Sequence, residues 1–138
     1  MTTARDIMTA QPECVATDDS LALAAQQMRR LKVGALPICG PDQKIKGVLT
    51  DRDIVVRGLG TGKDPGQTNS GSFNDGEAVT VGADDPIDEL LNVMIDHKVK
   101  RLPVIDGSKL VGMVSIADVA RNLPQPDVGQ LVEALSLD

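Results

Sequence analysis

The segment GVLTDRD, residues 47–53, recurs 65 residues further along the chain as GMVSIAD, residues 112–118. In each copy a glycine and two apolar residues lead to a hydroxyl residue, and an aspartate follows three positions later. This pattern predicts a strand that turns directly into a helix capped by the hydroxyl group. The same junction occurring twice in 138 residues predicts a fold built by internal duplication. The hydroxyl residues are Thr50 and Ser115, and the aspartates are Asp53 and Asp118.

The duplication extends towards the N-terminus of each junction. With a shift of 66 residues, the stretch LPI at 36–38 falls on LPV at 102–104, and an amphipathic stripe of apolar residues precedes both. Each copy therefore reads as strand, helix, strand, strand and helix. The expected strands cover residues 15–17, 35–39 and 45–49 in the first copy and 79–81, 102–105 and 110–114 in the second. The expected helices cover 21–31 and 51–59, then 87–95 and 116–122. Asp19 and Asp85 are expected to cap the first helix of each copy, with Ser20 and Pro86 at its first position.

These elements predict an α/β protein of the α+β kind, in which two β-α-β-β-α repeats pack as a pseudo-two-fold pair. One copy of about 60 residues buries little surface alone, so the two are expected to share a core through their sheets. Residues 60–76 are rich in Gly, Ser, Asn, Asp and Pro and lack periodicity, which is typical of a linker. The expected division places the N-terminal segment, the first repeat and the start of the linker in 1–66. The second repeat is expected in 67–125, and a C-terminal helix or tail in 126–138.

Charge and composition exclude several classes of protein. The net charge is −6, with +1 in residues 1–66 and −7 in residues 67–138, so neither half offers the basic surface that nucleic-acid binding requires. No apolar run is long enough to span a bilayer, and the N-terminus has no signal-peptide core, so we expect a cytoplasmic protein without membrane contact. His97 is the single histidine and has no nucleophile at an interpretable spacing, and no phosphate-binding glycine motif is present. The sequence therefore predicts no enzyme activity.

The repeated junction has two interpretations. In the first, it is a capping box, in which the hydroxyl group caps the helix and the aspartate answers from the first turn. In the second, the same geometry binds a nucleotide: the helix start and the hydroxyl group attract phosphate, and the carboxylate accepts hydrogen bonds from ribose hydroxyls. The preceding glycine, Gly47 or Gly112, would let a ligand or a second backbone approach closely.

The duplicated β-α-β-β-α unit, the Leu-Pro-Ile/Val strand and the Gly-x-x-Thr/Ser-x-x-Asp junction together resemble a tandem CBS-domain pair, also called a Bateman module. The resemblance covers roughly residues 4–125. The stretches GALPICG, LTDRDIVVRGL and RLPVI are also similar to the small stand-alone hypoxic response proteins of actinobacteria. The resemblance implies adenine-nucleotide binding in clefts between the two copies, assembly into a dimer, and regulation rather than catalysis.

The resemblance also implies roles for individual residues. Phosphate would be met by Thr50 and Ser115, and ribose by Asp53 and Asp118. In the family, basic residues at the positions of Lys100 and Arg101 lie against phosphate. The first copy has Gly34 and Ala35 there, which puts this contact in doubt for one cleft, and Arg52 is the expected substitute. Because the chain has no Trp or Tyr and one Phe, the adenine ring is expected between the aliphatic side chains of Ile38, Val104, Met8 and Val79.

The two cysteines, Cys14 and Cys39, have no counterpart in the second copy, where Thr80 and Ile105 stand. Three interpretations stay open: two independent buried thiols, a redox-dependent disulfide, or shared ligation of a metal. If the strands at 15–17 and 35–39 pair in parallel, Cys14 lies at the start of one and Cys39 at the end of the other, a strand length apart, which argues against bonding. The segment 9–13 could still carry Cys14 across to Cys39.

We therefore expect a non-catalytic sensor that binds AMP, ATP or another adenosyl ligand, requires no cofactor or metal, and forms a homodimer through its amphipathic helices. The alternative is a ligand-free dimeric stress protein that contacts an unknown protein target, through its dimer surface or a C-terminal helix over 128–137, with Cys14 and Cys39 as a redox or metal element.

Overall fold

The computed structural model describes residues 1–73 and 78–135, and it divides into two compact units. The first-repeat unit is Pro12–Ala78. The second-repeat unit combines Met1–Gln11 with Val79–Asp138. No helix among the described residues is long and apolar enough to cross a membrane.

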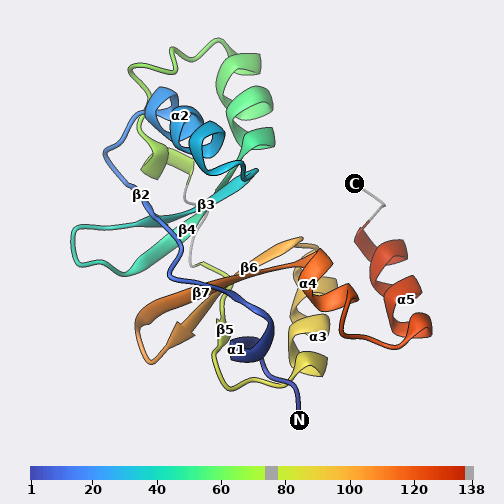
Figure 1. Cartoon of the computed structure of the whole chain (residues 1–138). Helices are drawn as coiled ribbons and strands as arrows, with labels where there is room; N and C mark the ends of the chain where they lie inside the picture. The colour runs from blue at the N-terminus through green and yellow to red at the C-terminus, as the bar shows by residue number, and fades with distance from the viewer. Residues whose placement is uncertain (74–77, 136–138) are drawn as a thin grey trace. The chain divides into compact units, whose positions relative to one another are not determined.

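The first-repeat unit contains a three-stranded sheet in the order β2-β3-β4 (Figure 1). Strand β2 runs parallel to β3, and β3 is antiparallel to β4. The elements in chain order are β2 (Val15–Ala16), α2 (Leu21–Leu31), β3 (Ala35–Cys39), β4 (Ile45–Thr50), a π-helical segment η1 (Asp53–Gly58), and two 3-10 turns, η2 (Leu59–Thr61) and η3 (Ser70–Phe73).

The second-repeat unit contains a four-stranded sheet in the order β1-β7-β6-β5. Its additional strand, β1, comes from the N-terminus and pairs antiparallel with β7. The elements are α1 (Ala4–Ile7), β1 (Thr9–Ala10), β5 (Val81–Gly82), α3 (Ile87–His97), β6 (Arg101–Asp106), β7 (Lys109–Ser115), α4 (Ile116–Ala120) and α5 (Gln125–Leu135). The duplicated β-α-β-β-α arrangement and the α+β class are thus confirmed.

The predicted N-caps are wrong by one residue. Helix α2 is capped by Ser20, whose hydroxyl oxygen accepts from the Leu23 N–H at 3.1 Å, and Pro86 holds the cap position of α3. Asp19 and Asp85 instead close the preceding turn. Each carboxylate accepts from the backbone N–H three residues earlier, Asp19 from Ala16 at 3.0 Å and Asp85 from Gly82 at 2.8 Å.

Several element ends also differ from expectation. The helix expected over 51–59 is wound as η1 and η2 up to Thr61, and the one expected over 116–122 ends at Ala120. The C-terminal helix begins at Gln125 rather than 128. Its residues Leu131 and Leu135 are buried in the second-repeat core, so its apolar face is already occupied by its own unit.

We call residues 68–73 of the predicted linker the linker strap. Its backbone forms three hydrogen bonds with the first repeat: Leu21 N–H donates to Thr68 O at 2.9 Å, Ser70 N–H to Asp19 O at 2.8 Å, and Gly71 N–H to Thr17 O at 2.8 Å. The strap therefore belongs to the first-repeat unit.

Residues 2–7, the N-terminal strap, make the same three bonds with the second repeat. Ile87 N–H donates to Thr2 O at 3.1 Å, Ala4 N–H to Asp85 O at 2.9 Å, and Arg5 N–H to Ala83 O at 2.9 Å. Every donor and acceptor lies 66 positions from its counterpart in the first-repeat unit. The division expected from sequence assigned the N-terminal segment to the first repeat, whereas the structure groups it with the second.

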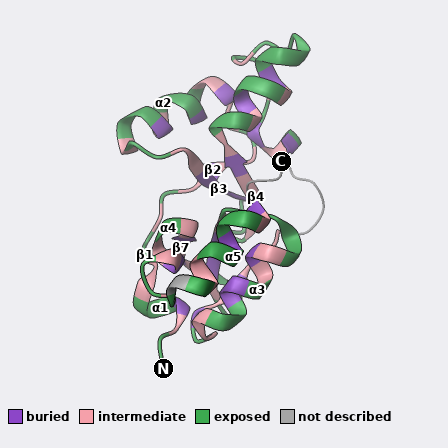
Figure 2. Cartoon of the chain, turned by 90° about the vertical axis from the view of Figure 1, so that its right-hand side faces the viewer, coloured by how far each residue is buried: buried purple, intermediate pink, exposed green. Residues whose placement is uncertain are grey.

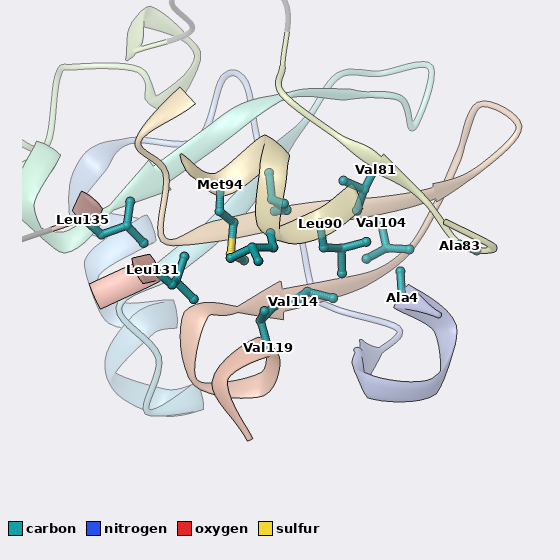
Figure 3. Packing of buried hydrophobic residues seen from close by; sticks show 12 residues of the cluster. Ala4, Val81, Ala83, Leu90, Met94, Val104, Val114, Val119, Leu131 and Leu135 are labelled. Atoms are coloured by element: carbon teal, nitrogen blue, oxygen red, sulfur yellow. The ribbon is translucent and has the colours of Figure 1, made fainter. Parts of the chain in front are cut away.

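Each unit has its own hydrophobic cluster. The first-repeat cluster includes Val15, Leu21, Ile38, Leu49 and Phe73. In the second-repeat cluster the strap residue Ala4 points in among the side chains of β5, β6 and α3 (Figure 3). Helices α2 and α3 bury one face and expose the remainder (Figure 2), as their amphipathic stripes predict.

Candidate functional site

In the first-repeat unit, the junction between β4 and η1 forms a reciprocal cap. The Thr50 N–H donates to Asp53 Oδ2 at 3.0 Å, and the Asp53 N–H donates to Thr50 Oγ1 at 3.1 Å. The Asp53 side chain is one-fifth exposed. Its second oxygen, Oδ1, lies 3.3 Å from Nη1 of Arg57, one turn further along.

The second-repeat unit repeats this geometry between β7 and α4. The Ser115 N–H donates to Asp118 Oδ2 at 2.9 Å, and the Asp118 N–H donates to Ser115 Oγ at 3.2 Å. Oδ1 of Asp118 lies 2.6 Å from Nη2 of Arg121. The capping-box interpretation is therefore confirmed in both copies, and each cap leaves one carboxylate oxygen facing an arginine.

The basic residues of the second repeat lie beside its cap. Arg101 is the β6 residue in register with Ser115, and the carbonyl of Lys100 accepts from the Ile116 N–H at 2.8 Å. In the first repeat Ala35 stands opposite Thr50, and the carbonyl of Gly34 accepts from the Asp51 N–H at 2.9 Å. The backbones correspond, but only the second cap has two cations at this position. Arg52 is exposed on the turn of the first cap, where its N–H donates to Asp51 Oδ1 at 2.9 Å.

The four aliphatic residues expected around adenine are buried or half-buried within their own units. Ile38 and Val104 have no exposed surface, because each is part of its unit's core. Met8 and Val79 are half-buried against the second-repeat cluster. The Met8 side chain packs directly over Gly112, where a Cβ atom would collide with it. The close approach that Gly112 permits is therefore made by Met8, in the N-terminal segment of the same chain.

Cys14 and Cys39 are joined in a disulfide, with their Cα atoms 5.7 Å apart. The two strands do pair in parallel, as the sequence argument supposed, but the strand-length separation inferred from that pairing is wrong. The register pairs Val15 with Ile38 and Ala16 with Cys39, so β2 lies against the end of β3. The disulfide borders a cavity of about 330 Å³ in the first-repeat unit. The cavity is lined by Cys14, Ala16, Thr17, Asp18, Asp19, Cys39, Gly40, Pro41 and Gln43 and does not include the cap residues.

Three residues near the caps were not predicted from the sequence: Arg57, Arg121 and Phe73. The two arginines stand four and three positions after the cap aspartates, a spacing that brings side chains together on one helical face. This spacing could have identified them. Phe73 stands in the strap, and its ring lies under Arg57, with 5.0 Å between the guanidinium carbon and the ring centroid. Nothing in the linker composition indicated that contact.

Comparison with known proteins gives consistent matches. The family model described as CBS domain matches residues 4–59 and 73–125. Hypoxic response protein 1 of Mycobacterium tuberculosis is 49% identical over 135 residues, which cover 98% of this chain and 94% of that protein. The crystal structure of Hypoxic Response Protein I with two coordinated zinc ions has a TM-score of 0.82 at 50% identity, covering 89% of this chain and 100% of that one.

Two further solved structures contain adenosyl compounds. CBSX2 in complex with AMP has a TM-score of 0.75 at 22% identity, over 88% of this chain and 96% of that one. The CBS domain pair of MJ0100, in complex with 5'-methylthioadenosine and S-adenosyl-L-methionine, has a TM-score of 0.78 at 24% identity, over 88% of this chain and 94% of that one. At these identities the likeness is one of fold.

Proposed function

Since this chain belongs to the CBS-domain family and carries that domain twice, we propose that it is a regulatory module that binds an adenine nucleotide or a related adenosyl ligand. The observation that carries the proposal is the duplicated cap. In each unit a carboxylate is fixed by the backbone through one oxygen and exposes part of its surface beside an arginine.

A ribose fits the chemistry of these carboxylates. A carboxylate oxygen has lone pairs beyond the one that a single N–H uses, and vicinal hydroxyl groups are donors that could reach them. Hydrogen bonds to an ionised group contribute more than those between neutral groups. Asp53 and Asp118 are therefore the proposed ribose ligands, and Thr50 and Ser115 are the proposed neighbours of the phosphate.

The two units are not equivalent towards phosphate. Lys100 and Arg101 give the second repeat two cations next to its cap, whereas the first repeat has Gly34 and Ala35 at the same backbone positions. Charged ligands such as AMP, ADP and ATP are therefore expected to bind more tightly at the second-repeat cap. Arg52 is the proposed phosphate partner at the first.

Isothermal titration calorimetry with AMP, ADP, ATP, NAD and S-adenosylmethionine tests the proposal. Asp118→Ala is expected to weaken binding by about 1–3 kcal/mol, the range for leaving polar groups without a partner. Arg101→Ala should weaken binding and reduce its dependence on salt. Asp96→Ala, on the exposed surface of α3, is the matched control and should bind as wild type does. Equal affinity in wild type and Asp118→Ala would remove the ribose assignment.

We also propose a homodimer. The apolar stripes of α2 and α3 bury themselves in their own units, so a dimer contact would use other residues than those stripes. Large apolar side chains of the first-repeat unit remain about half exposed, among them Leu23 at 53%, Val55 at 58% and Leu59 at 52%. Sedimentation at micromolar concentration is expected to give twice the chain mass of 14.5 kDa. Leu23→Glu should shift the mass towards 14.5 kDa, and a monomeric wild type would refute the dimer.

The zinc ions of Hypoxic Response Protein I do not fit the residues described for this chain. Zinc requires thiolate, imidazole or carboxylate ligands. Here both cysteines are consumed by the disulfide, and within residues 1–73 and 78–135 no three His, Cys, Asp or Glu side chains gather as metal ligands do. We therefore propose no role for zinc. The proposed compartment is the cytoplasm, where a disulfide is expected to be redox-dependent.

A further inference from the structure

Phe73 is the single aromatic residue of the chain, and it lies beneath a charged group of the candidate site. The Phe73 side chain is only 6% exposed and belongs to the first-repeat cluster, so its ring has a fixed place. The guanidinium of Arg57 stacks over that ring at 5.0 Å and points Nη1 at Asp53 Oδ1, 3.3 Å away. The strap thus supports an arginine that in turn supports the cap aspartate.

The Asp53 carboxylate is held at two points. Oδ2 accepts from the Thr50 N–H, and Oδ1 faces Arg57, so rotation of the carboxylate about its bond to Cβ would break both contacts. An aromatic face below a guanidinium restricts the long arginine side chain, while the N–H groups at its planar edge can donate to a carboxylate. The side chains of Asp53 and Arg57 are 20% and 42% exposed, so the pair is only partly screened by solvent.

The second-repeat cap lacks this support. Arg121 reaches Asp118 at 2.6 Å, but its side chain is 68% exposed and no aromatic residue exists elsewhere in the sequence to stack on it. An exposed ion pair of this kind loses side-chain entropy when it forms and contributes little. Asp118 Oδ2 instead accepts from both the Ser115 N–H at 2.9 Å and the Ser115 hydroxyl at 3.0 Å. The two carboxylates therefore differ in which groups hold them.

We infer that Arg57, held by Phe73 of the linker strap, is a positioning residue for the ribose-binding carboxylate of the first repeat. The inference rests on the proposed function, since it deepens the role of Asp53. It gives the two sites different chemistry. The second repeat recognises its ligand with two added cations, whereas the first repeat, which lacks them, depends on a carboxylate that Arg57 orients before the ligand arrives.

Amide hydrogen exchange of the ligand-free protein tests the positioning directly. Arg57→Gln and Phe73→Leu are expected to accelerate exchange of the Thr50 amide several-fold, because Asp53 Oδ2 no longer holds that N–H. Amides of β3 and the Ser115 amide should keep their wild-type rates. Arg57→Lys retains the charge but loses the planar stacking, so it should fail to restore slow exchange at Thr50. An unchanged Thr50 rate in Arg57→Gln would overturn the inference, and a uniform acceleration across β3 would assign Phe73→Leu to general destabilisation.

Ligand titration then tests the consequence. In an Asp118→Ala background, which removes the second-repeat ribose contact, Arg57→Gln should weaken binding of adenosine several-fold and leave that of 2',3'-dideoxyadenosine unchanged. Arg121→Gln in the same background is the matched control and should change neither. Equal weakening for both ligands would overturn a role through the ribose carboxylate. If wild type binds no adenosyl ligand, the proposed function fails, and the Thr50 exchange rate alone decides whether Arg57 holds Asp53.

Discussion

The linker strap and the N-terminal strap make the same three backbone hydrogen bonds, although two of the three strap residues involved differ. Thr68, Ser70 and Gly71 stand where Thr2, Ala4 and Arg5 stand in the other unit. Because the bonds use only backbone groups, they place few constraints on the side chains. The duplication therefore includes the straps, although their sequences have diverged.

Because the side chains have diverged, each strap position in one unit can be compared with the corresponding position in the other. Three positions differ in ways that physical chemistry can rank. They are the apolar anchors Phe73 and Ile7, the buried positions Ser70 and Ala4, and the helical-turn positions Ser72 and Asp6. Substitutions at these positions test how far the two units differ in stability. Reduction of the disulfide, which only the first repeat has, is a further test.

The largest difference is expected at the apolar anchors. Phe73 is 6% exposed in its cluster, whereas Ile7 is half-buried. Phe73→Ala should lower the free energy of unfolding of the first-repeat unit by about 3–5 kcal/mol, and Ile7→Ala that of the second by about 1–2 kcal/mol. Urea unfolding followed by circular dichroism measures the totals. Exchange of the Leu21 and Ile87 amides, each bonded to its strap, separates the units. Equal losses would mean that the two anchors contribute alike.

The disulfide should produce the next largest difference. It closes a loop with a sequence separation of 25 in the first-repeat unit, and the second has Thr80 and Ile105 at those positions. On the chain-entropy estimate, reduction should cost about 3–4 kcal/mol, confined to the first-repeat unit. Counting free thiols in unreduced, denatured protein checks the premise. Zero reactive thiols per chain are expected, and two would show that the disulfide does not form.

Local signals in the sequence identified the elements and both caps, because a capping box needs only a hydroxyl residue and an acid three positions apart. The same reasoning placed the helix caps one residue too early, at Asp19 and Asp85 instead of Ser20 and Pro86. An acid before a helix can bond either forwards or backwards, and here each bonds back to Ala16 or Gly82. The neighbouring Ser20 then takes the cap of α2.

Other missed features depend on contacts distant in sequence. The straps have no periodicity, because they contribute backbone atoms and one anchor each. The register of β2 against the end of β3, which brings Cys14 to Cys39, follows from the tertiary pairing rather than from either segment. The Arg57–Phe73 contact likewise joins a helix to a strap 16 positions later.

A smaller effect, of opposite sign, is expected at Ser70. Its side chain has no exposed surface, and its hydroxyl group has no hydrogen-bond partner among the described residues. The other strap has Ala4 at this position, also fully buried. Removing an unsatisfied hydroxyl group should therefore stabilise the protein, so Ser70→Ala is expected to raise the free energy of unfolding by about 1 kcal/mol. The reciprocal Ala4→Ser should lower it by at least as much. Destabilisation by Ser70→Ala would show that the hydroxyl group has a partner after all.

The smallest difference concerns pH. Asp6 accepts hydrogen bonds from the Thr3 N–H at 2.9 Å and from the Thr3 hydroxyl at 3.2 Å, and these bonds, the backbone one first, hold the pKa of Asp6 below its ordinary value of 3.8. A carboxyl whose pKa is lower in the folded state stabilises the fold above its unfolded pKa. This contribution is lost as the pH falls through the folded pKa. The N-terminal strap should therefore loosen in acid.

The linker strap has no titrating group at the corresponding position, because Ser72 stands where the N-terminal strap has Asp6. The Ser72 hydroxyl donates to the Asn69 carbonyl at 2.6 Å. Asp6→Ser, which copies that strap, should be less stable than wild type at pH 6 and equal to it below the folded pKa of Asp6. Unfolding curves at the two pH values measure this. The Thr3 amide shift should titrate with Asp6 in wild type, and a stability gap that persists in acid would assign the effect of Asp6→Ser to packing instead. Ser72→Asp should transfer the acid sensitivity to the linker strap, since an acid in the first turn of η3 meets the same helical start.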